Sequence, residues 1–241
     1  MAVGAAGRRG DYLRRRILLV HSKAFGLMTV SRIVIFANGV LPDLDKARGL
    51  LHGDETVICA DGGTRHALAL GLIPAMVIGD RDSLSDEDRR RVSDAKVVVV
   101  PYSHDKDQTD LELALQYALS MSPAAILIVG GLGRRLDHTL GNLALLTDPR
   151  LDQIDCRLDD GVEEAWFCRG VCEIRGAAGD LVSLIPWGMP ATGVHTLGLR
   201  WPLADGILRP EKTLGISNEM LGESATVRLE TGSLLVVHRR Q

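Results

Sequence analysis

Short apolar runs alternate with polar or amphipathic stretches between residues 32 and 150. Most of these runs end at Gly, Asp or Asn, the residue types that favour turns. Continuous apolar runs of this length are typical of strands in a parallel sheet that is covered on both faces. The pattern therefore predicts five buried strands, at residues 32–38, 56–60, 74–79, 96–101 and 124–131.

Helical patterns lie between these predicted strands. From Leu111 onward, apolar residues recur at the spacing of one buried helix face. Thr109 and Glu112 have the spacing of a capping box, so we expect a helix to begin at Thr109. Further helices are expected over residues 64–70 and from about Asp137. Strands that alternate with helices in this way predict an open, mostly parallel α/β/α domain.

The pattern changes after about residue 150, where short strands are separated by Gly and Pro. Apolar and polar residues alternate around Val227, and residues 230–232 predict a hairpin connection to the apolar run at 234–237. Closely spaced strands of this kind predict a β-sandwich. The expected organisation is a leader over 1–30, an α/β domain over 31–155 and a β-sandwich domain over 156–241.

Composition limits the classes of partner. The chain has 241 residues, of which 46% are hydrophobic, enough for one large domain or two modest ones. The formal net charge of −3 gives no general attraction to nucleic acid or to an anionic membrane. Four cysteines without a CxxC pair argue against a zinc ribbon and favour reduced thiols. We therefore expect a cytoplasmic protein with no nucleic-acid or membrane partner.

The first 30 residues are basic, with six Lys and Arg against one acid, Asp11. An Arg-rich and acid-poor leader is a property of transit peptides. Its apolar run ILLV is too short for a membrane span. We favour a disordered tail, or translation that begins at Met28, over a targeting segment.

Acidic residues follow four of the predicted strands. The carboxyl ends of parallel strands meet at one edge of a sheet, where ligands bind. Carboxylates gathered there repel one another unless a cation neutralises them, and Mg²⁺ prefers oxygen ligands and pairs with phosphates. The sequence therefore predicts a Mg–nucleotide site at this edge. The acids are Asp61, Asp80, Asp82, Asp105, Asp107, Asp110 and Asp137, and the nearby bases are Lys106, Arg134 and Arg135.

Each of these features also has a purely structural explanation. Asp110 and Asp137 fall in the first turn of a predicted helix, where a carboxylate compensates the helix dipole. Asp80 and Asp82 could cap the polar segment that follows them. The glycine pair 62–63 could form only a tight turn, although it would also let backbone N–H groups approach a phosphate. Four such loops in one α/β frame favour the ligand site.

Several motifs follow one another along the chain, namely RIVIFANG, CADGG, GDRDSL, DKDQTDLELAL, GGLGRRLDHTLGNLALL, GDLVSLIPWG, GLRWPL and GISNE. In the order and spacing of these motifs, the chain resembles the thiamine pyrophosphokinase family over about residues 32–240. The resemblance implies an α/β domain followed by a β-sandwich, and a homodimer with active sites between subunits. It also implies a Mg²⁺-dependent transfer of pyrophosphate from ATP to thiamine, which gives thiamine diphosphate and AMP.

The resemblance further implies a role for individual positions. The metal ligands and catalytic carboxylates are Asp80, Asp82 and Asp110. Nucleotide-site positions are Asp61, Thr109, Arg135 and Asp137, with Lys106 close to substrate and Gly62, Gly63 and Gly131 expected along the phosphates. The thiamine-binding positions are Ser217 and Asn218, with Trp201 as a candidate for stacking on the cationic rings. The alternative for Trp201 is a place in the core of the sandwich.

Two positions depart from the family pattern. Arg81 stands between the two acids, where an apolar or aromatic residue is usual, and it would compete with the metal if it pointed inward. Thr64 and Arg65 follow the CADGG motif, where Ala-Asn is common, so one nucleotide or substrate contact is in question.

Two other functions remain open from the residues alone. The DRDS segment is similar to an Asp-x-Asp phosphatase nucleophile, which would form a covalent aspartyl-phosphate. That function leaves GISNE and the second domain without a role. The other alternative is a non-catalytic module that binds nucleotide or thiamine. So many acids at a ligand edge are costly without a metal, which argues against this alternative.

Overall fold

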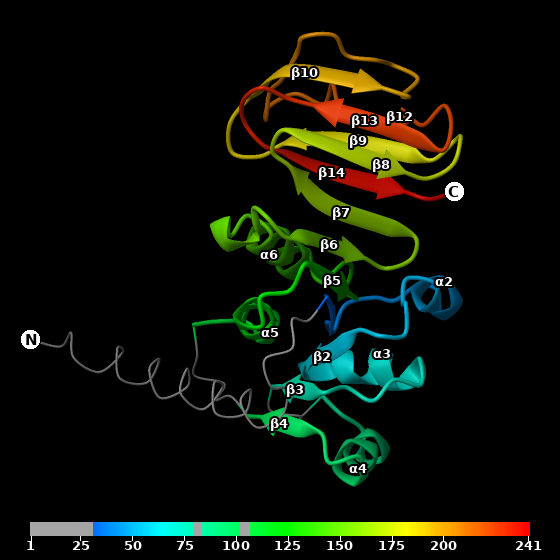
Figure 1. The fold of residues 1–241 in the computed structure, drawn as a ribbon, viewed down its shortest axis with the longest axis vertical. Coiled ribbons are helices and arrows are strands. Elements are labelled where there is room, and N and C mark those ends of the chain that lie inside the picture. The colour runs from blue at the N-terminus through cyan, green and yellow to red at the C-terminus, as the bar shows by residue number, and fades with distance from the viewer. Residues whose placement is uncertain (1–30, 80–82, 102–106) are drawn as a thin grey trace, which may run out of the picture.

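The computed structural model describes residues 31–79, 83–101 and 107–241, which form two sheets and the helices around them. A ten-stranded mixed sheet extends along the molecule, and a four-stranded antiparallel sheet packs over its C-terminal part (Figure 1). Among the described residues, no helix is long and apolar enough to span a membrane. The leader and the predicted site residues Asp80, Arg81, Asp82, Asp105 and Lys106 lie outside the described residues.

The five strands predicted in the first part of the chain are confirmed; β2 has the predicted bounds, and the other four are somewhat shorter than their apolar runs. A sixth parallel strand joins them, and the spatial order is β6-β5-β1-β2-β3-β4. The strands are β1 (Arg32–Phe36), β2 (Thr56–Ala60), β3 (Met76–Ile78), β4 (Val98–Val100), β5 (Ala125–Val129) and β6 (Asp155–Asp159). The helices are α2 (Leu44–Arg48), α3 (Thr64–Ala69), α4 (Asp86–Asp94), α5 (Asp110–Ser120) and α6 (Leu136–Leu145), with short 3₁₀ turns η1 (Asp61–Gly63) and η2 (Pro149–Leu151).

Both faces of this parallel sheet are buried, as the continuous apolar runs predict. In β1, Ile33 and Ile35 enter a core that is covered by α5 and α6. Val34 and Phe36 enter a second core on the opposite face, which α3 covers. All four side chains are fully buried, and each contributes about 1.5–3 kcal/mol to folding relative to exposure. This packing holds the carboxyl ends of the central strands in fixed positions.

The C-terminal part is a β-sandwich, as predicted. One layer continues the large sheet with β7 (Glu163–Cys168), β14 (Leu234–Arg239), β9 (Leu181–Pro186) and β12 (Asn218–Glu219). The other layer is β8 (Val171–Arg175), β13 (Ser224–Arg228), β10 (Ala191–Leu197) and β11 (Gly206–Leu208). A single apolar cluster that includes Ile174, Val194 and Val236 fills the space between the layers. Because the large sheet is continuous through β6, the boundary predicted at residue 155 stays a prediction.

The hairpin predicted at residues 230–232 is wrong. Strands β13 and β14 belong to different sheets, so residues 230–232 cross from one layer of the sandwich to the other. Alternation correctly places Ala225 and Val227 in the core, and Leu234 and Val236 face the same core from the opposite side. Alternation determines which face of a strand is buried, but it does not determine the neighbouring strand.

Candidate active site

A pocket of about 360 Å³ lies at the carboxyl edge of the parallel sheet, where the sequence predicts the nucleotide site. Six of the predicted residues line it directly. These are Asp61, Thr109, Asp110, Gly131, Arg134 and Arg135. Other lining residues come from the loops after β1 and β5 and from α6, namely Asn38, Gly39, Gly130, Gly133, His138 and Asn142.

Asp61 follows β2 directly and has a left-handed backbone with a φ of 44°. The Ser83 hydroxyl donates a hydrogen bond of 2.5 Å to Oδ2 of Asp61, and the Thr64 hydroxyl donates to its backbone carbonyl at 2.8 Å. The other carboxylate oxygen, Oδ1, is buried and has no hydrogen-bond partner among the described residues. An unpartnered buried carboxylate oxygen is costly, so this atom is suited to a cation or a ligand donor.

Glycine is required at three positions around Asp61. A Cβ on Gly79, whose φ is 139°, would lie 3.0 Å from the Cα of Asp61. A Cβ on Gly62 would lie 2.6 Å from the side-chain amide of Asn38, and one on Gly63 would overlap the backbone carbonyl of Phe36. Residues 62 and 63 must therefore be glycine, in the first place, because η1 packs closely against the end of β1.

Helix α5 begins as the sequence predicts. The Thr109 hydroxyl accepts a hydrogen bond from the backbone N–H of Glu112 at 3.2 Å, so Thr109 is the N-cap. The Glu112 side chain is instead occupied by Gln108, whose Nε2 donates to it at 2.7 Å. Because Thr109 fixes the start of the helix, Asp110 stands in its first turn at the edge of the pocket.

Arg135 and Asp137 are brought together at the start of α6. Nε and Nη2 of Arg135 donate to the two carboxylate oxygens of Asp137 at 3.1 and 2.6 Å, a bidentate geometry. This hydrogen bonding raises the pKa of Arg135 and lowers the pKa of Asp137. Both groups stay ionised at neutral pH, with Arg135 on the pocket wall.

Two further residues of the pocket, Asn38 and Asn142, have no predicted site role. Asn38 follows β1 at the same sheet edge as the acids, and Nδ2 of Asn142 donates to the carbonyl of Gly131 at 2.7 Å. The rule that located the acids, a polar residue at the carboxyl end of a parallel strand, would also have located Asn38. Asn142 lies inside α6 and carries no such signal.

The predicted thiamine-binding residues are also brought together, in the sandwich. Nδ2 of Asn218 donates to the backbone carbonyl of Trp201 at 2.7 Å, and the Trp201 N–H donates to Oδ1 of Asn218 at 3.1 Å. The neighbouring Ser217 has a φ of 58°, and its N–H donates to the hydroxyl of Ser183 at 3.0 Å. The Trp201 side chain is 58% exposed, so its alternative place in the core is wrong.

These two groups of residues are far apart within one chain. Asn218 is in β12, at one end of the ten-stranded sheet, whereas the pocket lies at the ends of β5, β1 and β2. Figure 1 shows β12 near the top of the molecule and β5 and β2 well below it. Five strands separate β12 from β1, which at the usual spacing of neighbouring strands is about 29 Å. The two groups therefore cannot contact the same small substrate from one chain.

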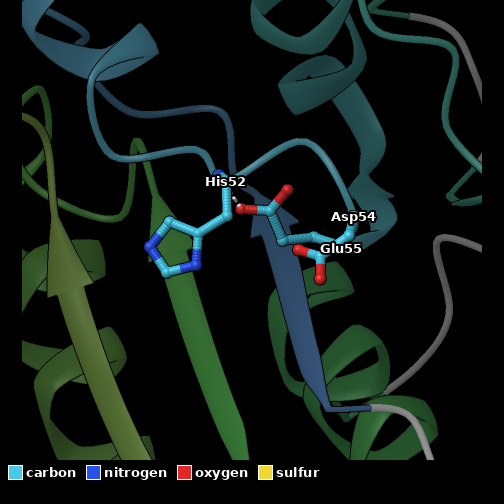
Figure 2. A group of neighbouring side chains, drawn as sticks. All are labelled: His52, Asp54 and Glu55. Carbon is cyan, nitrogen blue, oxygen red and sulfur yellow. Dashed lines mark hydrogen bonds between the residues drawn. The ribbon is translucent and has the colours of Figure 1, made fainter.

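A separate cluster of possible metal ligands lies before β2, where His52, Asp54 and Glu55 have ligand atoms within 4.8 Å of one another (Figure 2). The Glu55 carboxylate, however, accepts hydrogen bonds from Arg32 at 2.8 Å and from the backbone N–H groups of His52 and Gly53. Burial alone would raise the pKa of Glu55, but these hydrogen bonds and the charge of Arg32 lower it. The cluster fixes a loop at the amino edge of the sheet, away from the pocket.

Comparisons with known proteins show the family to which the chain belongs. The family model "Thiamin pyrophosphokinase, catalytic domain" matches residues 47–158, and "Thiamin pyrophosphokinase, vitamin B1 binding domain" matches residues 172–236. A thiamine pyrophosphokinase from Bacillus subtilis is 32% identical over 213 residues, which cover 88% of this chain and 98% of the relative. Thiamine pyrophosphokinase 1 of Arabidopsis thaliana is 30% identical over 208 residues, covering 75% of this chain and 76% of the relative.

Solved structures show the same likeness. The crystal structure of the Bacillus subtilis protein has a TM-score of 0.80 at 31% identity and covers 88% of this chain and 100% of its own. The crystal structure of a thiamin pyrophosphokinase from Geobacillus thermodenitrificans has a TM-score of 0.77 at 26% identity. The match covers 87% of this chain and 98% of that one. Fold and matched regions define an enzyme with a catalytic part and a vitamin-binding part. The chain belongs to the thiamine pyrophosphokinase family, and it is a transferase of the kinase type.

Proposed function

We propose that the enzyme transfers the pyrophosphate group of ATP to the primary hydroxyl of thiamine, which gives thiamine diphosphate and AMP. The observation that carries this proposal is the pair of groups described above. One is a pocket with carboxylates, glycines and arginines at a sheet edge. The other is the exposed side chain of Trp201, whose backbone Asn218 holds, in the part matched as vitamin-binding. Such transfers depend mainly on positioning and on charge neutralisation around the phosphates.

We propose Mg²⁺ as the neutralising ion. Oxygen donors suit this ion, and Oδ1 of Asp61 is a buried oxygen without a partner among the described residues. Asp110 lines the same pocket, and Gly79, which packs against Asp61, immediately precedes Asp80. Asp80, Asp82 and Asp110 would hold the metal, which would neutralise charge on the ATP phosphates. Arg135, with Lys106 and Thr109, would bind the nucleotide beside it.

We propose that the working unit is a homodimer whose active sites lie between subunits. The separation of about 29 Å within one chain supports this, because reacting atoms must come within roughly 3–3.5 Å. Both regions also expose apolar side chains of the kind that subunit contacts bury. Leu136 and Leu140 of α6 are 74% and 49% exposed beside the pocket, and Leu197 and Leu221 are 72% and 61% exposed in the sandwich.

In this dimer, Trp201, Ser217 and Asn218 of one subunit would present thiamine to the nucleotide pocket of the other. The exposed face of Trp201 would stack on the cationic thiazolium ring, a contact worth about 0.5–2 kcal/mol. We place the enzyme in the cytoplasm, where the four cysteines, all free, would stay reduced.

A single product analysis tests the reaction. Purified protein is incubated with ATP, Mg²⁺ and thiamine, and the nucleotides and thiamine species are then separated by chromatography. Equal amounts of AMP and thiamine diphosphate, both absent when thiamine is omitted, are the expected result. ADP with thiamine monophosphate would contradict pyrophosphoryl transfer. Phosphate released regardless of thiamine would identify a hydrolase, and ligand binding without turnover a binding module.

A further inference from the structure

Arg134 is held in an unusual conformation at the pocket wall. Its φ is 64°, a left-handed value that is unfavourable for a residue with a long side chain. Nη1 of Arg134 donates two hydrogen bonds to Asn38, one to the backbone carbonyl at 3.1 Å and one to Oδ1 at 3.2 Å. The Asn38 amide is itself fixed, because it packs so closely on Gly62 that no Cβ would fit there. Strained residues of this kind are concentrated at functional sites.

The charge around Arg134 is positive. Burial, and next the charge of Arg134, lower the pKa of Arg65 in α3, and Asp61 only partly opposes them. Burial also lowers the pKa of His66, with a smaller contribution in the same direction from both arginines. Arg135 is paired with Asp137, whereas Arg134 donates its two hydrogen bonds among the described residues to neutral oxygens of Asn38. A guanidinium that keeps its full charge beside a second cation favours an anion in this part of the pocket.

We propose that Arg134 is an additional binding residue for the polyphosphate of the nucleotide, and that Asn38 is a positioning residue that aims it. This inference rests on the proposed placement of ATP in the pocket. The proposed residue is Arg134, whereas the family resemblance implies a nucleotide-site role for its neighbour Arg135. The guanidinium has five N–H donors, so Nη1 can stay on Asn38 while the others bind phosphate oxygens.

The left-handed backbone allows an unusually clean test. Arg134→Gly removes the guanidinium at a position where glycine relieves the strain, so the protein should unfold at the same temperature as wild type or a higher one. We expect the Kd for Mg–ATP, measured by titration calorimetry, and the KM for ATP to rise about tenfold. The KM for thiamine should not change. Arg48→Ala, which removes an exposed arginine of α2 that pairs with Asp45, is the matched control and should leave all three constants unchanged.

The role of Asn38 is tested by combining variants. Asn38→Ala removes one of the two acceptors of Arg134, so it should raise the Kd for Mg–ATP by less than Arg134→Gly does. The double variant should bind no more weakly than Arg134→Gly alone, because both changes act through one guanidinium. Effects that multiply would refute the positioning role. Normal ATP affinity in Arg134→Gly would overturn the inference alone, whereas a wild-type protein without ATP affinity would overturn the proposed nucleotide site and the inference with it.

Discussion

Replacing His238 by Ala should destabilise the protein more than most single substitutions, because this side chain is a cation between two buried carboxylates. His238 in β14 is fully buried, and its two ring nitrogens lie 2.9 Å from Oε1 of Glu164 and 2.9 Å from Oδ2 of Asp180. Both ring nitrogens can donate only when the imidazole is protonated. A Cβ on Gly176 would lie 2.7 Å from Nε2, so the site has no spare volume.

The size of the effect follows from what the substitution leaves behind. The Glu164 and Asp180 side chains are only 7% and 6% exposed, and they would face each other without the imidazolium. Removing one partner from a buried charged group costs about 3–5 kcal/mol. Arg240 stays 3.3 Å from Glu164 and compensates part of the loss, which favours the lower end of that range. For a chain of this size, about 3 kcal/mol corresponds to a decrease in Tm of roughly 6–12 °C.

The pH dependence gives an independent check. Burial alone would lower the pKa of His238, but the hydrogen bonds that its ring N–H groups donate to Glu164 and Asp180, and the charges of these carboxylates, raise it above the usual 6.5. The stabilisation is therefore complete below about pH 6.5 and is lost as the pH rises through the folded-state pKa. Glu164 and Asp180 have lowered pKa values, so their contribution is lost only as the pH falls below about 4.5.

Urea unfolding followed by circular dichroism between pH 5 and 9 measures both effects. Wild type should lose stability with rising pH more steeply than His238→Ala, whose curve lacks this contribution. His195→Ala, which changes an exposed histidine, should alter the free energy of unfolding by less than about 0.5 kcal/mol. A His238→Ala protein as stable as wild type, with the same pH profile, would refute the assignment of a buried imidazolium.

Three further predictions concern the pocket and the sandwich. Asp110→Asn should lower kcat by about 100-fold or more in steady-state assays while the circular dichroism spectrum stays that of the folded protein, and a wild-type kcat would remove Asp110 from the metal site. Asn218→Ala should raise the KM for thiamine by about tenfold but not the KM for ATP, because it releases the loop that carries Trp201. Equal effects on both constants would contradict a thiamine-binding role of Asn218. Gly63→Ala should destabilise the protein by about 1–3 kcal/mol in urea unfolding, because its Cβ would overlap the Phe36 carbonyl, and an unchanged midpoint would show that the loop can move aside.

The sequence predicted the parallel sheet well because its strands are buried on both faces and are therefore continuously apolar. It did not predict α4, which Ser85 caps but which buries only Val92 among mostly charged residues. A helix that packs through one side chain has too little apolar periodicity to be recognised. The prediction of strand pairing in the sandwich failed for a different reason. The alternation around Val227 specifies which face of the strand is buried, but it does not specify the neighbouring strand.

The candidate site was predicted to a similar degree. Carboxylates at strand ends predicted a site at the edge of the sheet where the pocket lies, because the topology of a parallel sheet brings those ends together whatever their separation in sequence. The strand-end rule could have located Asn38, but it could not predict the contact of Asn38 with Arg134, since the two residues are 96 positions apart in sequence. The distance between the pocket and Asn218 also required the strand order, which local patterns do not contain.

The central claim is that each active site combines the nucleotide pocket of one subunit with the thiamine residues of the other. The most direct measurement uses a hybrid dimer of one Asp110→Asn chain and one Asn218→Ala chain, purified through two different affinity tags. At a thiamine concentration well below the KM of Asn218→Ala, each parent homodimer should have little activity. The hybrid has one intact pair of half-sites and should recover about half of the wild-type rate. A hybrid no more active than its parents would show that the site lies within a single chain, and would contradict the account.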